Sequence, residues 1–316
     1  MSSPPNAASR LSALSALPHE ELGRDLPAGR VLVVRAREQV GALLEAELAI
    51  RAGSADGVHD ARVACRRLAA ALAMFRPLLR TEVSEPLRDE LRWLARSLGT
   101  ARDDDVTRER LLDLARTRVD KDVDAGPLIE QLQSEDWSTA AEGRPGTSVL
   151  DTGRYDGLLA TLEAFVTDPP WRPMVHEDAG PFLRRRVGKE WHRLVSVVSV
   201  VTDAPPGTST DEQLHDARKA VKRMRYALET AELLWPRKPR ALRKHVRDLT
   251  DVLGEHQDTV MARSALSHLV EQAESVGSPT FVHGHLHEME HHRAVELEAR
   301  FRNEWAATVE VRRDWP

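Results

Sequence analysis

The residues best suited to chemistry in this chain are basic side chains and histidines in a segment that occurs twice. Residues 58–67 read VHDARVACRR, and residues 214–223 read LHDARKAVKR. Arginines and lysines spaced three and four residues apart lie on one side of a helix, where neighbouring like charges repel each other. A face of this kind is typical of a binding site for an anion, and the alternative is an ordinary solvated helix face.

A helical projection of the two copies separates a cationic face from an apolar face. At about 100° per residue, the cationic face of the second copy spans roughly 120° and contains His215, Arg218, Lys219, Lys222, Arg225 and Tyr226. The first copy repeats the centre of this face with His59, Arg62 and Arg66. The opposite faces are apolar, with Ala217, Ala220, Val221, Met224, Ala227 and Leu228 in one copy and Ala61, Ala64, Cys65, Leu68, Ala71 and Leu72 in the other. Each copy therefore predicts an amphipathic helix with a buried apolar face.

Three observations favour a binding site over a solvated face. The cationic face occurs twice at equivalent places, it contains no acidic residue between His215 and Tyr226, and the whole chain has a net charge of -5. Arg185, Lys189 and Arg193 in the preceding helix add a third basic row at i, i+4 and i+8. Arginine and lysine both bind phosphate oxygens, and rows of them suit a long, repeating polyanion.

Few aromatic side chains accompany these basic rows. Proteins that read nucleic-acid bases stack them on aromatic rings, and here only Tyr226 lies on the cationic face, with Trp191 nearby. A polyanion without bases is therefore favoured, and nucleic acid is the least favoured partner. A scaffold for acidic partner proteins is also compatible with the sequence, and it would show exposed apolar patches beside the charges.

The histidines suggest further roles. His59 and His215 each lie three residues before an arginine, where an imidazole can donate to phosphate or hydrogen-bond the neighbouring helix corner. The last helix is crowded with His283, His285, His287, His291 and His292, and residues 287–291 match the His-Glu-x-x-His pattern of zinc hydrolases. A catalytic metal there would make the chain a metal-dependent hydrolase or phosphate-processing enzyme. A structural or solvated role is favoured over adventitious metal binding and over catalysis, so we expect no catalytic residue, no metal ion and no cofactor.

The composition is that of a helical globular protein. Hydrophobic residues make up 41% of the 316 residues and charged residues 30%, and Cys65 is the only cysteine. Cys65 lies on an apolar helix face, so we expect it to be buried rather than reactive, and a reducing compartment fits. The start of the chain lacks the apolar core of a signal peptide, and no apolar run reaches the ~20 residues needed to span a membrane. We expect a soluble, cytoplasmic protein without a membrane partner, and the sequence leaves its oligomeric state open.

Helical periodicity predicts the same series of elements twice. The first half contains helices over residues 31–51, 56–79, 86–98 and 103–119, and the second half over 181–201, 211–235, 239–253 and 257–275. Between the halves we predict helices over 128–133 and 155–166, and a last helix covers 283–305. The valine-rich residues 194–201 are predicted to be the buried end of a helix rather than a strand.

Short motifs predict how these helices begin and turn. Thr210 and Gln213 are expected to form a capping box, and Ser54 or Asp56 to cap the helix of the first copy. The pattern Leu-Gly-x-x-x-Asp occurs at residues 98–103 and 253–258. We expect a helix–helix corner at each, with the glycine in the left-handed conformation and the aspartate capping the next helix. Alternatively, each aspartate also pairs with an arginine or histidine of the basic helix.

The duplicated His-Asp-Ala-Arg-x-Ala-x-x-Arg motif, the Arg-Tyr-Ala-Leu-Glu sequence at 225–229 and both Leu-Gly-x-x-x-Asp patterns resemble the CHAD family, the conserved histidine α-helical domain. The resemblance covers residues 22–305. It implies an all-α fold of two pseudo-symmetric four-helix bundles packed together around a basic groove or pore. It also implies noncatalytic binding of inorganic polyphosphate and association with polyphosphate granules. The matching positions are His59, Arg62, Arg66, Arg67, His215, Arg218, Lys219, Lys222, Arg223 and Arg225. Arg185, Lys189, Arg193 and Tyr226 complete the predicted polyphosphate site.

Two departures from the family pattern affect these expectations. Many relatives carry a CYTH domain ahead of this one, whereas we expect a stand-alone CHAD domain without triphosphate chemistry. Val63 and Ala69 stand where the second copy has Lys219 and Arg225. The second half is therefore expected to contribute more positive charge than the first.

The predicted domain organisation follows from these segments. We expect a flexible N-terminal tail over residues 1–18, one CHAD domain over 19–306 and a C-terminal tail over 307–316. Within the domain, the first helical half covers about 19–125, the connecting segment about 126–176 and the second helical half about 177–306.

Overall fold

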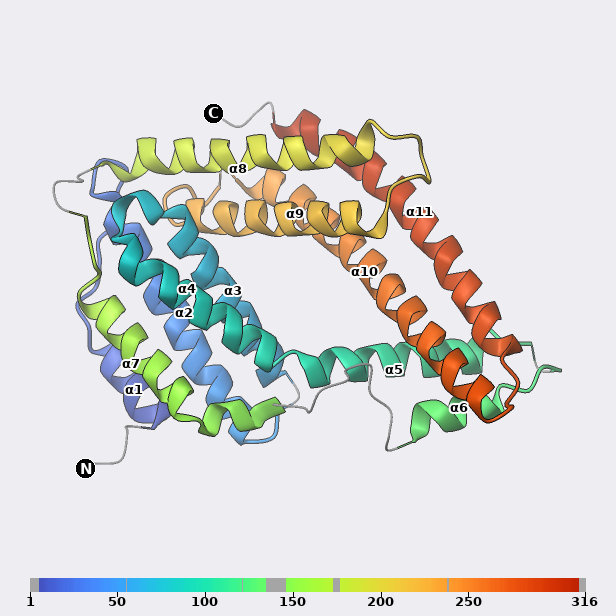
Figure 1. Cartoon of the computed structure of the whole chain (residues 1–316). Helices are drawn as coiled ribbons and strands as arrows, with labels where there is room; N and C mark the ends of the chain where they lie inside the picture. Colours follow the sequence, from blue (N-terminus) through green and yellow to red (C-terminus); the bar gives the residue numbers. More distant parts are fainter. Residues whose placement is uncertain are drawn as a thin grey trace.

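The computed structural model describes residues 6–54, 56–120, 122–134, 146–172, 177–237 and 239–312, except for the side chains of residues 100–105 and 146. These residues form eleven α-helices and no strand (Figure 1), which confirms the predicted all-α class. The helices are α1 (Ala7–Ser15), α2 (Ala28–Arg51), α3 (Gly57–Met74), α4 (Thr81–Ser97), α5 (Thr100–Thr117), α6 (Gly126–Gln133), α7 (Gly153–Thr167), α8 (Ala179–Thr202), α9 (Asp211–Ala231), α10 (Arg240–Ser275) and α11 (Phe281–Arg312). Two short 3-10 helices, Arg76–Leu78 and Gly146–Asp151, lie before α4 and α7.

The two copies of the basic segment form α3 and α9, and their predicted apolar faces are buried. Val221 and Met224 of α9 are fully buried, as are Leu68 and Leu72 of α3. Cys65 is buried as predicted, and this burial raises the pKa of its thiol to about 12. The thiol is therefore protonated near neutral pH, and Cys65 is a core residue rather than a nucleophile.

Two apolar cores hold the helices together. The larger core joins α1 to α4 and α7 to α9 with the first part of α10 and the last part of α11. The smaller core lies at the other end of α10 and α11, where Leu266 and Leu286 pack with Leu111 of α5 and Leu132 of α6. The long helices α10 and α11 therefore connect the two cores (Figure 1).

The structure departs from the predicted first four-helix bundle at α5. Helices α2, α3 and α4 pack together with α7, whereas α5 extends away from them and packs against α6, α10 and α11. The fourth helix of the first half thus contributes to a core shared with the second half. An apolar stripe such as that of Leu111 and Ala115 predicts that a helix is buried, but it does not specify the partner.

The helices predicted over 239–253 and 257–275 are one continuous helix, α10, and Gly254 lies inside it. Among the described glycines, positive φ angles occur at Gly53, Gly207 and Gly277. Gly99 does lie between α4 and α5, but its φ of -87° is in the right-handed region. The predicted left-handed glycines are therefore wrong at both positions. A glycine inside a helix costs only about 1 kcal/mol relative to alanine, and the extensive packing of α10 against α11 offsets this cost.

Helices occupy parts of both predicted tails. Helix α1 begins after Asn6, whose side-chain oxygen accepts from the backbone N–H of Ser9 at 2.9 Å. Arg10 of α1 is buried and pairs with Glu163 of α7 at 2.6 Å. At the other end, α11 extends to Arg312. Residues 7–15 and 307–312, which the sequence assigns to the two tails, are therefore helical.

The predicted start of α9 is confirmed. Thr210 Oγ1 accepts from the backbone N–H of Gln213 at 3.2 Å, and the Gln213 side chain accepts from the backbone N–H of Thr210 at 2.8 Å. Asp56 precedes α3, but its side chain makes no capping hydrogen bond, so the predicted side-chain cap is wrong there. Residues 194–201 are helical as predicted, but only one side is buried, since Val195 and Val200 are 38% and 51% exposed. None of the described helices is long and apolar enough to cross a membrane.

Candidate functional site

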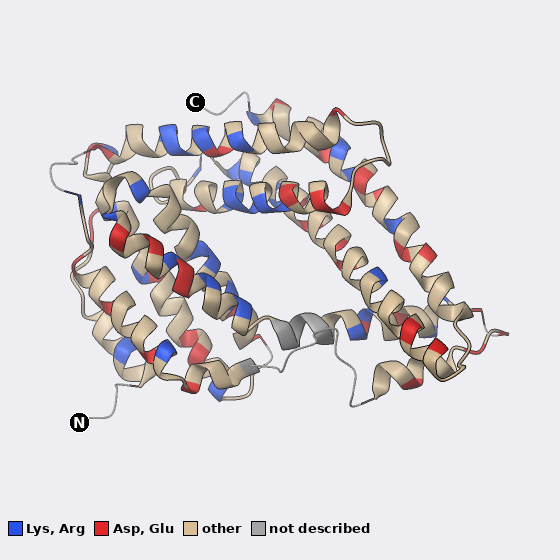
Figure 2. Cartoon of the chain, in the orientation of Figure 1, with Lys and Arg blue, Asp and Glu red and all other residues tan. Residues whose placement is uncertain are grey.

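The two basic helices of the repeat lie side by side. Helices α3 and α9 contact each other, with α4 and α8 on one side of this contact and α10 on the other. Figure 2 shows Lys and Arg residues following one another along α8, α9 and α3. A pocket lies on each side of the α3–α9 contact.

The α4–α8 pocket is a cavity of about 400 Å³ between α3, α4, α8 and α9. Its floor is apolar, with Met74 of α3 and Leu91 of α4 among the lining side chains. Its cationic lining residues are Arg66, Arg88, Arg92, Arg193, Lys219, Lys222 and Arg223. Glu190 is the one acidic residue among the described side chains that line it. This excess of positive charge gives the pocket a positive potential that attracts anions.

The α10 pocket, also about 400 Å³ in volume, lies between α3, α9 and α10. Its basic lining residues are His59, Arg66, Arg67, Arg218, Lys222 and Arg225. Helix α10 adds the acidic residues Asp251, Glu255 and Asp258. The charges in the α10 pocket are therefore mixed, unlike those in the α4–α8 pocket.

Arg66, Lys222 and Tyr226 line both pockets, at the contact between α3 and α9. Burial, together with the positive charges of Arg218 and Arg66, lowers the pKa of Lys222 to about 7. Lys222 makes no hydrogen bond or ion pair with any described residue. A nearby anion favours the charged form of an amine, so Lys222 gains a proton most readily when an anion binds.

Three arginines near Lys222 also lack a partner among the described residues. Arg66 has a buried Nε without a hydrogen-bond acceptor, and Arg193 and Arg223 form no ion pair or hydrogen bond with a described residue. Burial lowers the pKa of Arg223, and the neighbouring charge of Arg193 lowers it further. Glu190 offsets only part of this charge, and crowded cations are unfavourable in a folded protein. These four side chains are therefore the most available for an anionic ligand.

Two other predicted site residues, Arg67 and Arg225, share the carboxylate of Glu229. Arg67 Nε donates to Glu229 Oε2 at 2.9 Å, and Arg225 Nε donates to Glu229 Oε1 at 3.0 Å. Glu229 is buried, and its backbone carbonyl accepts from Arg35 of α2. Arg67 of α3 and Arg35 of α2 therefore link the first half to α9, whereas the Arg225–Glu229 pair lies within α9. Arg67 and Arg225 also line the α10 pocket.

The third basic row does not reach the pockets as a unit. Arg193 lines the α4–α8 pocket, whereas Arg185 and Lys189 line neither pocket. Arg185 Nη2 donates to Glu177 Oε2 at 2.9 Å, and Lys189 is exposed. Of the predicted row, only Arg193 is therefore placed with the other basic residues.

His215 and Lys219 each contact a neighbouring polar side chain. His215 Nδ1 forms a hydrogen bond of 2.6 Å with Gln257 Oε1 of α10. A hydrogen bond from this histidine to a neighbouring segment is one of the two roles suggested by the sequence. Lys219 Nζ donates to Asp216 Oδ1 at 3.0 Å. Asp216 lies beside the cationic face and offsets part of the positive charge of that face. His59, by contrast, is exposed and lines the α10 pocket.

The two Leu-Gly-x-x-x-Asp motifs lie beside the basic helices. The guanidinium of Arg62 is so close to Gly99 that a Cβ at this glycine would lie 2.8 Å from Arg62 Cζ. Gly254 lines the α10 pocket, and a Cβ there would meet no atom within 4 Å. Of the two aspartates, Asp258 lines the same pocket, and the side chain of Asp103 lies outside the described residues. Gly99 therefore permits the close approach of Arg62 at the corner between α4 and α5, whereas Gly254 leaves open space at the α10 pocket.

Arg88 and Arg92 of α4 also line the α4–α8 pocket, although they are not among the site residues predicted from the sequence. Arg88 pairs with Glu85 and donates to the backbone carbonyl of Ala69 at 3.3 Å, and Arg92 pairs with Asp89. Their i, i+4 spacing places them on one helix face and is the signal that the sequence offers. It is weak, because each arginine has an acidic neighbour at i-3.

The histidine-rich part of α11 contains no group of three metal ligands among the described residues. His283 is buried and its Nε2 lies 2.7 Å from Gln131 Oε1 of α6, and burial lowers the pKa of this histidine. Glu290 is buried and accepts two hydrogen bonds, of 3.0 and 2.9 Å, from Arg110 of α5. These contacts hold α5 and α6 against α11 and give His283 and Glu290 structural roles.

The chain is similar in sequence to proteins of a known family. The model of the CHAD domain family matches residues 35–267. The chain is 28% identical over 262 residues to two proteins of Mycobacterium tuberculosis, the uncharacterized protein MT2285 of strain CDC 1551 / Oshkosh and the uncharacterized protein Rv2226 of strain ATCC 25618 / H37Rv. These matches cover 80% of this chain and 48% of each relative, so the chain spans about half the length of the curated relatives it matches.

Two solved structures share the fold. PptA from Streptomyces chartreusis superposes with a TM-score of 0.71 at 21% sequence identity, over 89% of this chain and 99% of that chain. The CHAD domain from the plant Ricinus communis superposes with a TM-score of 0.60 at 23% identity, over 95% of this chain and 96% of that chain. The family model spans well over half of the sequence and includes both basic helices, so the chain belongs to the CHAD domain family.

Proposed function

We propose that this protein binds inorganic polyphosphate without turning it over, and that the α4–α8 pocket and the α10 pocket together form one basic groove for the ligand. The observation that carries the proposal is the position of Arg66 and Lys222, which line both pockets and lack a partner among the described residues. A linear polyanion passing from one pocket to the other would contact both side chains. It would supply negative charge beside these two side chains.

The composition of the pockets supports a polyanion without bases. Tyr226 is the one aromatic residue among the described side chains that line them, whereas binders of single-stranded nucleic acid stack successive bases on several rings. Arginines offer planar two-pronged donors to phosphate oxygens and lysine offers a point charge, so the mixture tolerates many registers of a repeating chain. The resemblance to the CHAD family points to the same ligand and to association with polyphosphate granules.

Noncatalytic binding is supported by the side chains that would face the ligand. Cleavage of a phosphoanhydride needs an activated nucleophile or a metal-bound water. Cys65 lines the α4–α8 pocket, but its raised pKa keeps the thiol protonated. In the α10 pocket, Glu255 already accepts from Arg293 at 2.6 Å.

The function is tested by titrating the protein with polyphosphates of several chain lengths and with single-stranded DNA of matched charge at the same salt concentration. We expect polyphosphate to bind more tightly than DNA, and long chains to bind more tightly than chains too short to reach both pockets. Equal affinity for the two polymers would contradict polyphosphate as the specific ligand.

A pair of variants tests the location of the site. We expect Arg218→Ala combined with Lys222→Ala to weaken polyphosphate binding at least about tenfold, by the loss of two charged contacts. Helix content should stay intact, because neither residue lies on the buried face of α9. The matched control is Arg185→Ala with Lys189→Ala, which removes the same net charge from outside both pockets and should leave affinity nearly unchanged. Equal losses in the two double variants would contradict the groove.

The absence of turnover is tested by incubating polyphosphate with the protein and either Mg²⁺ or Zn²⁺ and then measuring its chain length. We expect no change relative to a protein-free sample. Shortening that disappears in the Arg218→Ala, Lys222→Ala variant would show that the groove belongs to a phosphate-processing enzyme.

A further inference from the structure

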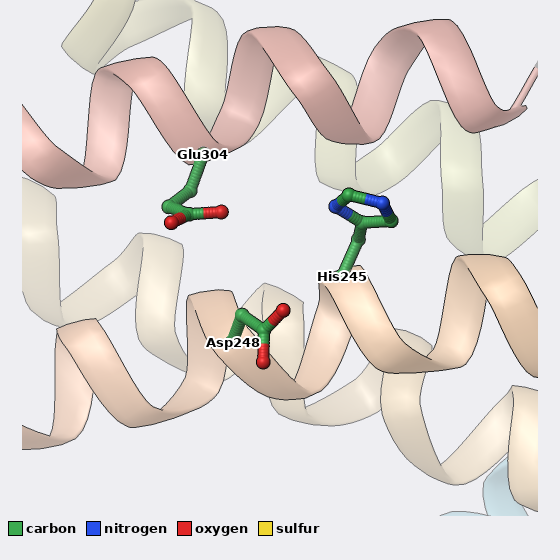
Figure 3. Close-up of side chains that lie close together, drawn as sticks. All are labelled: His245, Asp248 and Glu304. Atoms are coloured by element: carbon green, nitrogen blue, oxygen red, sulfur yellow. The ribbon is translucent and has the colours of Figure 1, made fainter.

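A group of three metal-ligand side chains lies between α10 and α11, outside both pockets. It consists of His245 and Asp248 of α10 and Glu304 of α11, and one ligand atom of each lies within 4.8 Å of the other two. Figure 3 shows the three side chains extending from their two helices into the same space. None of these residues lines the α4–α8 pocket or the α10 pocket, and none belongs to the histidine-rich residues 283–292.

The group is electrostatically incomplete. Neither the Asp248 nor the Glu304 carboxylate forms an ion pair or a side-chain hydrogen bond with any described residue. His245 Nδ1 is buried and has no hydrogen-bond partner among the described residues. Two neighbouring carboxylates repel each other, and a buried ring nitrogen without a partner is unfavourable. One cation among the three side chains would remove both penalties.

The donor set indicates which cation fits. An imidazole nitrogen with two carboxylate oxygens is a ligand set that zinc and similar divalent transition ions accept, whereas magnesium and calcium prefer sites made of oxygen alone. Spacing of i and i+3 places His245 and Asp248 on one face of α10, and Glu304 closes the site from the opposite helix. All three side chains are partly exposed, so an ion can reach them from solvent.

We propose that His245, Asp248 and Glu304 bind a divalent transition-metal ion of the zinc class, which links α10 to α11. The link would fix the last part of α11, where Trp305 follows Glu304 and stacks on Trp191 of α8 with ring centroids 5.4 Å apart. An ion that binds only the folded chain stabilises it in proportion to the logarithm of its concentration over its dissociation constant. The site is therefore a structural clamp on the second half, and it does not depend on polyphosphate binding.

The test uses the full chain after a chelator has removed bound metal and has itself been removed. Polyphosphate is left out of the sample because it binds metal ions. Zn²⁺ is titrated while binding is measured by calorimetry and the unfolding midpoint by circular dichroism. We expect one strong site and a higher midpoint in the presence of Zn²⁺. Glu304→Gln and His245→Ala should each weaken this site at least tenfold and remove most of the midpoint shift.

Two controls separate this site from a folding defect and from zinc binding at the histidine-rich segment. Without metal, Glu304→Gln should have a midpoint equal to or above that of the unmodified chain, because it removes a carboxylate repulsion, and this outcome excludes a folding defect. The His287→Ala, His291→Ala double variant should keep the strong site. The proposal is overturned if the strong site and midpoint shift persist in Glu304→Gln and His245→Ala, if they disappear instead with His287 and His291, or if Zn²⁺ shows no strong site.

Discussion

The α4–α8 pocket and the α10 pocket lie on opposite sides of the same two basic helices, yet their charges are balanced differently. In the α4–α8 pocket, Arg193 and Arg223 form no hydrogen bond or close ion pair with a described residue, and Glu190 is the one acidic side chain among the described residues that line the pocket. In the α10 pocket, Arg67 and Arg225 share the buried carboxylate of Glu229, and α10 contributes three further acidic side chains. The α4–α8 pocket thus carries the larger unbalanced positive charge.

This difference in charge balance shows that a basic repeat alone does not predict where an anion binds. A guanidinium that already donates to a carboxylate must release or share that partner before it binds a ligand, and its net contribution falls accordingly. Residues of the same type on the same helix therefore divide into structural and binding groups. We expect polyphosphate to be held mainly in the α4–α8 pocket and by the residues at the α3–α9 contact.

The largest expected effect is a difference in polyphosphate affinity between two double variants, one for each group of arginines. Arg193→Ala with Arg223→Ala removes two unpaired charges and should weaken polyphosphate binding about 30-fold, since a charge-assisted hydrogen bond contributes about 1 kcal/mol or more. Arg67→Ala with Arg225→Ala removes two paired charges and should weaken binding less than about threefold. Calorimetric titration at one salt concentration measures both.

Protein stability should respond in the opposite order. The Arg67→Ala, Arg225→Ala variant leaves the buried Glu229 carboxylate without these hydrogen-bond donors, so its free energy of unfolding should fall by about 1–3 kcal/mol. The Arg193→Ala, Arg223→Ala variant removes charge repulsion and should be at least as stable as the unmodified chain. Urea denaturation provides this measurement, and equal losses of both affinity and stability in the two variants would contradict the division of the arginines.

An intermediate effect concerns Lys222, which belongs to both pockets. Because its pKa is lowered to about 7, Lys222 is charged in the free protein below this pH and largely neutral above it. Polyphosphate favours the charged form, so binding above pH 7 must take up a proton, and affinity should fall as the pH rises from 6 to 8. We expect a loss of about fivefold to tenfold relative to Lys222→Arg, whose guanidinium stays charged.

The comparison with Lys222→Arg is what makes the pH measurement specific. Any other group whose protonation changes with pH, including the ligand, is present in both proteins and affects their profiles equally. Parallel pH profiles for the two proteins would show that Lys222 does not gain its proton on binding.

The smallest expected effect is a difference in the free energy of unfolding between alanine variants of Gly99 and Gly254. Gly254→Ala should raise the free energy of unfolding by up to about 1 kcal/mol, because Gly254 lies inside α10 and its Cβ would meet open space. Gly99→Ala should displace the flexible Arg62 guanidinium, which a Cβ would approach to 2.8 Å, with little gain in stability. Urea denaturation of both variants tests this, and a stabilisation by Gly99→Ala equal to that of Gly254→Ala would contradict the close approach of Arg62.

Features that depend on local periodicity could be predicted from the sequence. The buried faces of α3 and α9, the capping box at Thr210 and the burial of Cys65 all follow from spacing within one helix, and the structure has each of them. The departure of α5 from the first bundle could not be predicted in this way. Its apolar stripe fits more than one partner, and the choice depends on where α10 ends and α11 begins.

The same limit applies to the candidate site. The sequence identified nearly all of the basic residues, but their partners lie far away in the chain. Glu229 is separated from Arg67 by 162 positions, and helical spacing contains no information about such a contact. Arg185 and Lys189 share the spacing of Arg193 but lie outside both pockets, because only part of that row extends to the α3–α9 contact.

The most direct test of a polyanion bound at the α3–α9 contact is the salt dependence of affinity in the Arg66→Ala, Lys222→Ala variant. Each charged contact with a polyanion releases counterions and adds to the slope of log affinity against log salt. We predict that this slope is about two units shallower than in the unmodified chain, because each lost contact lowers it by about one, while Arg185→Ala with Lys189→Ala leaves it unchanged. Identical slopes in all three proteins would contradict binding at the contact that both pockets share.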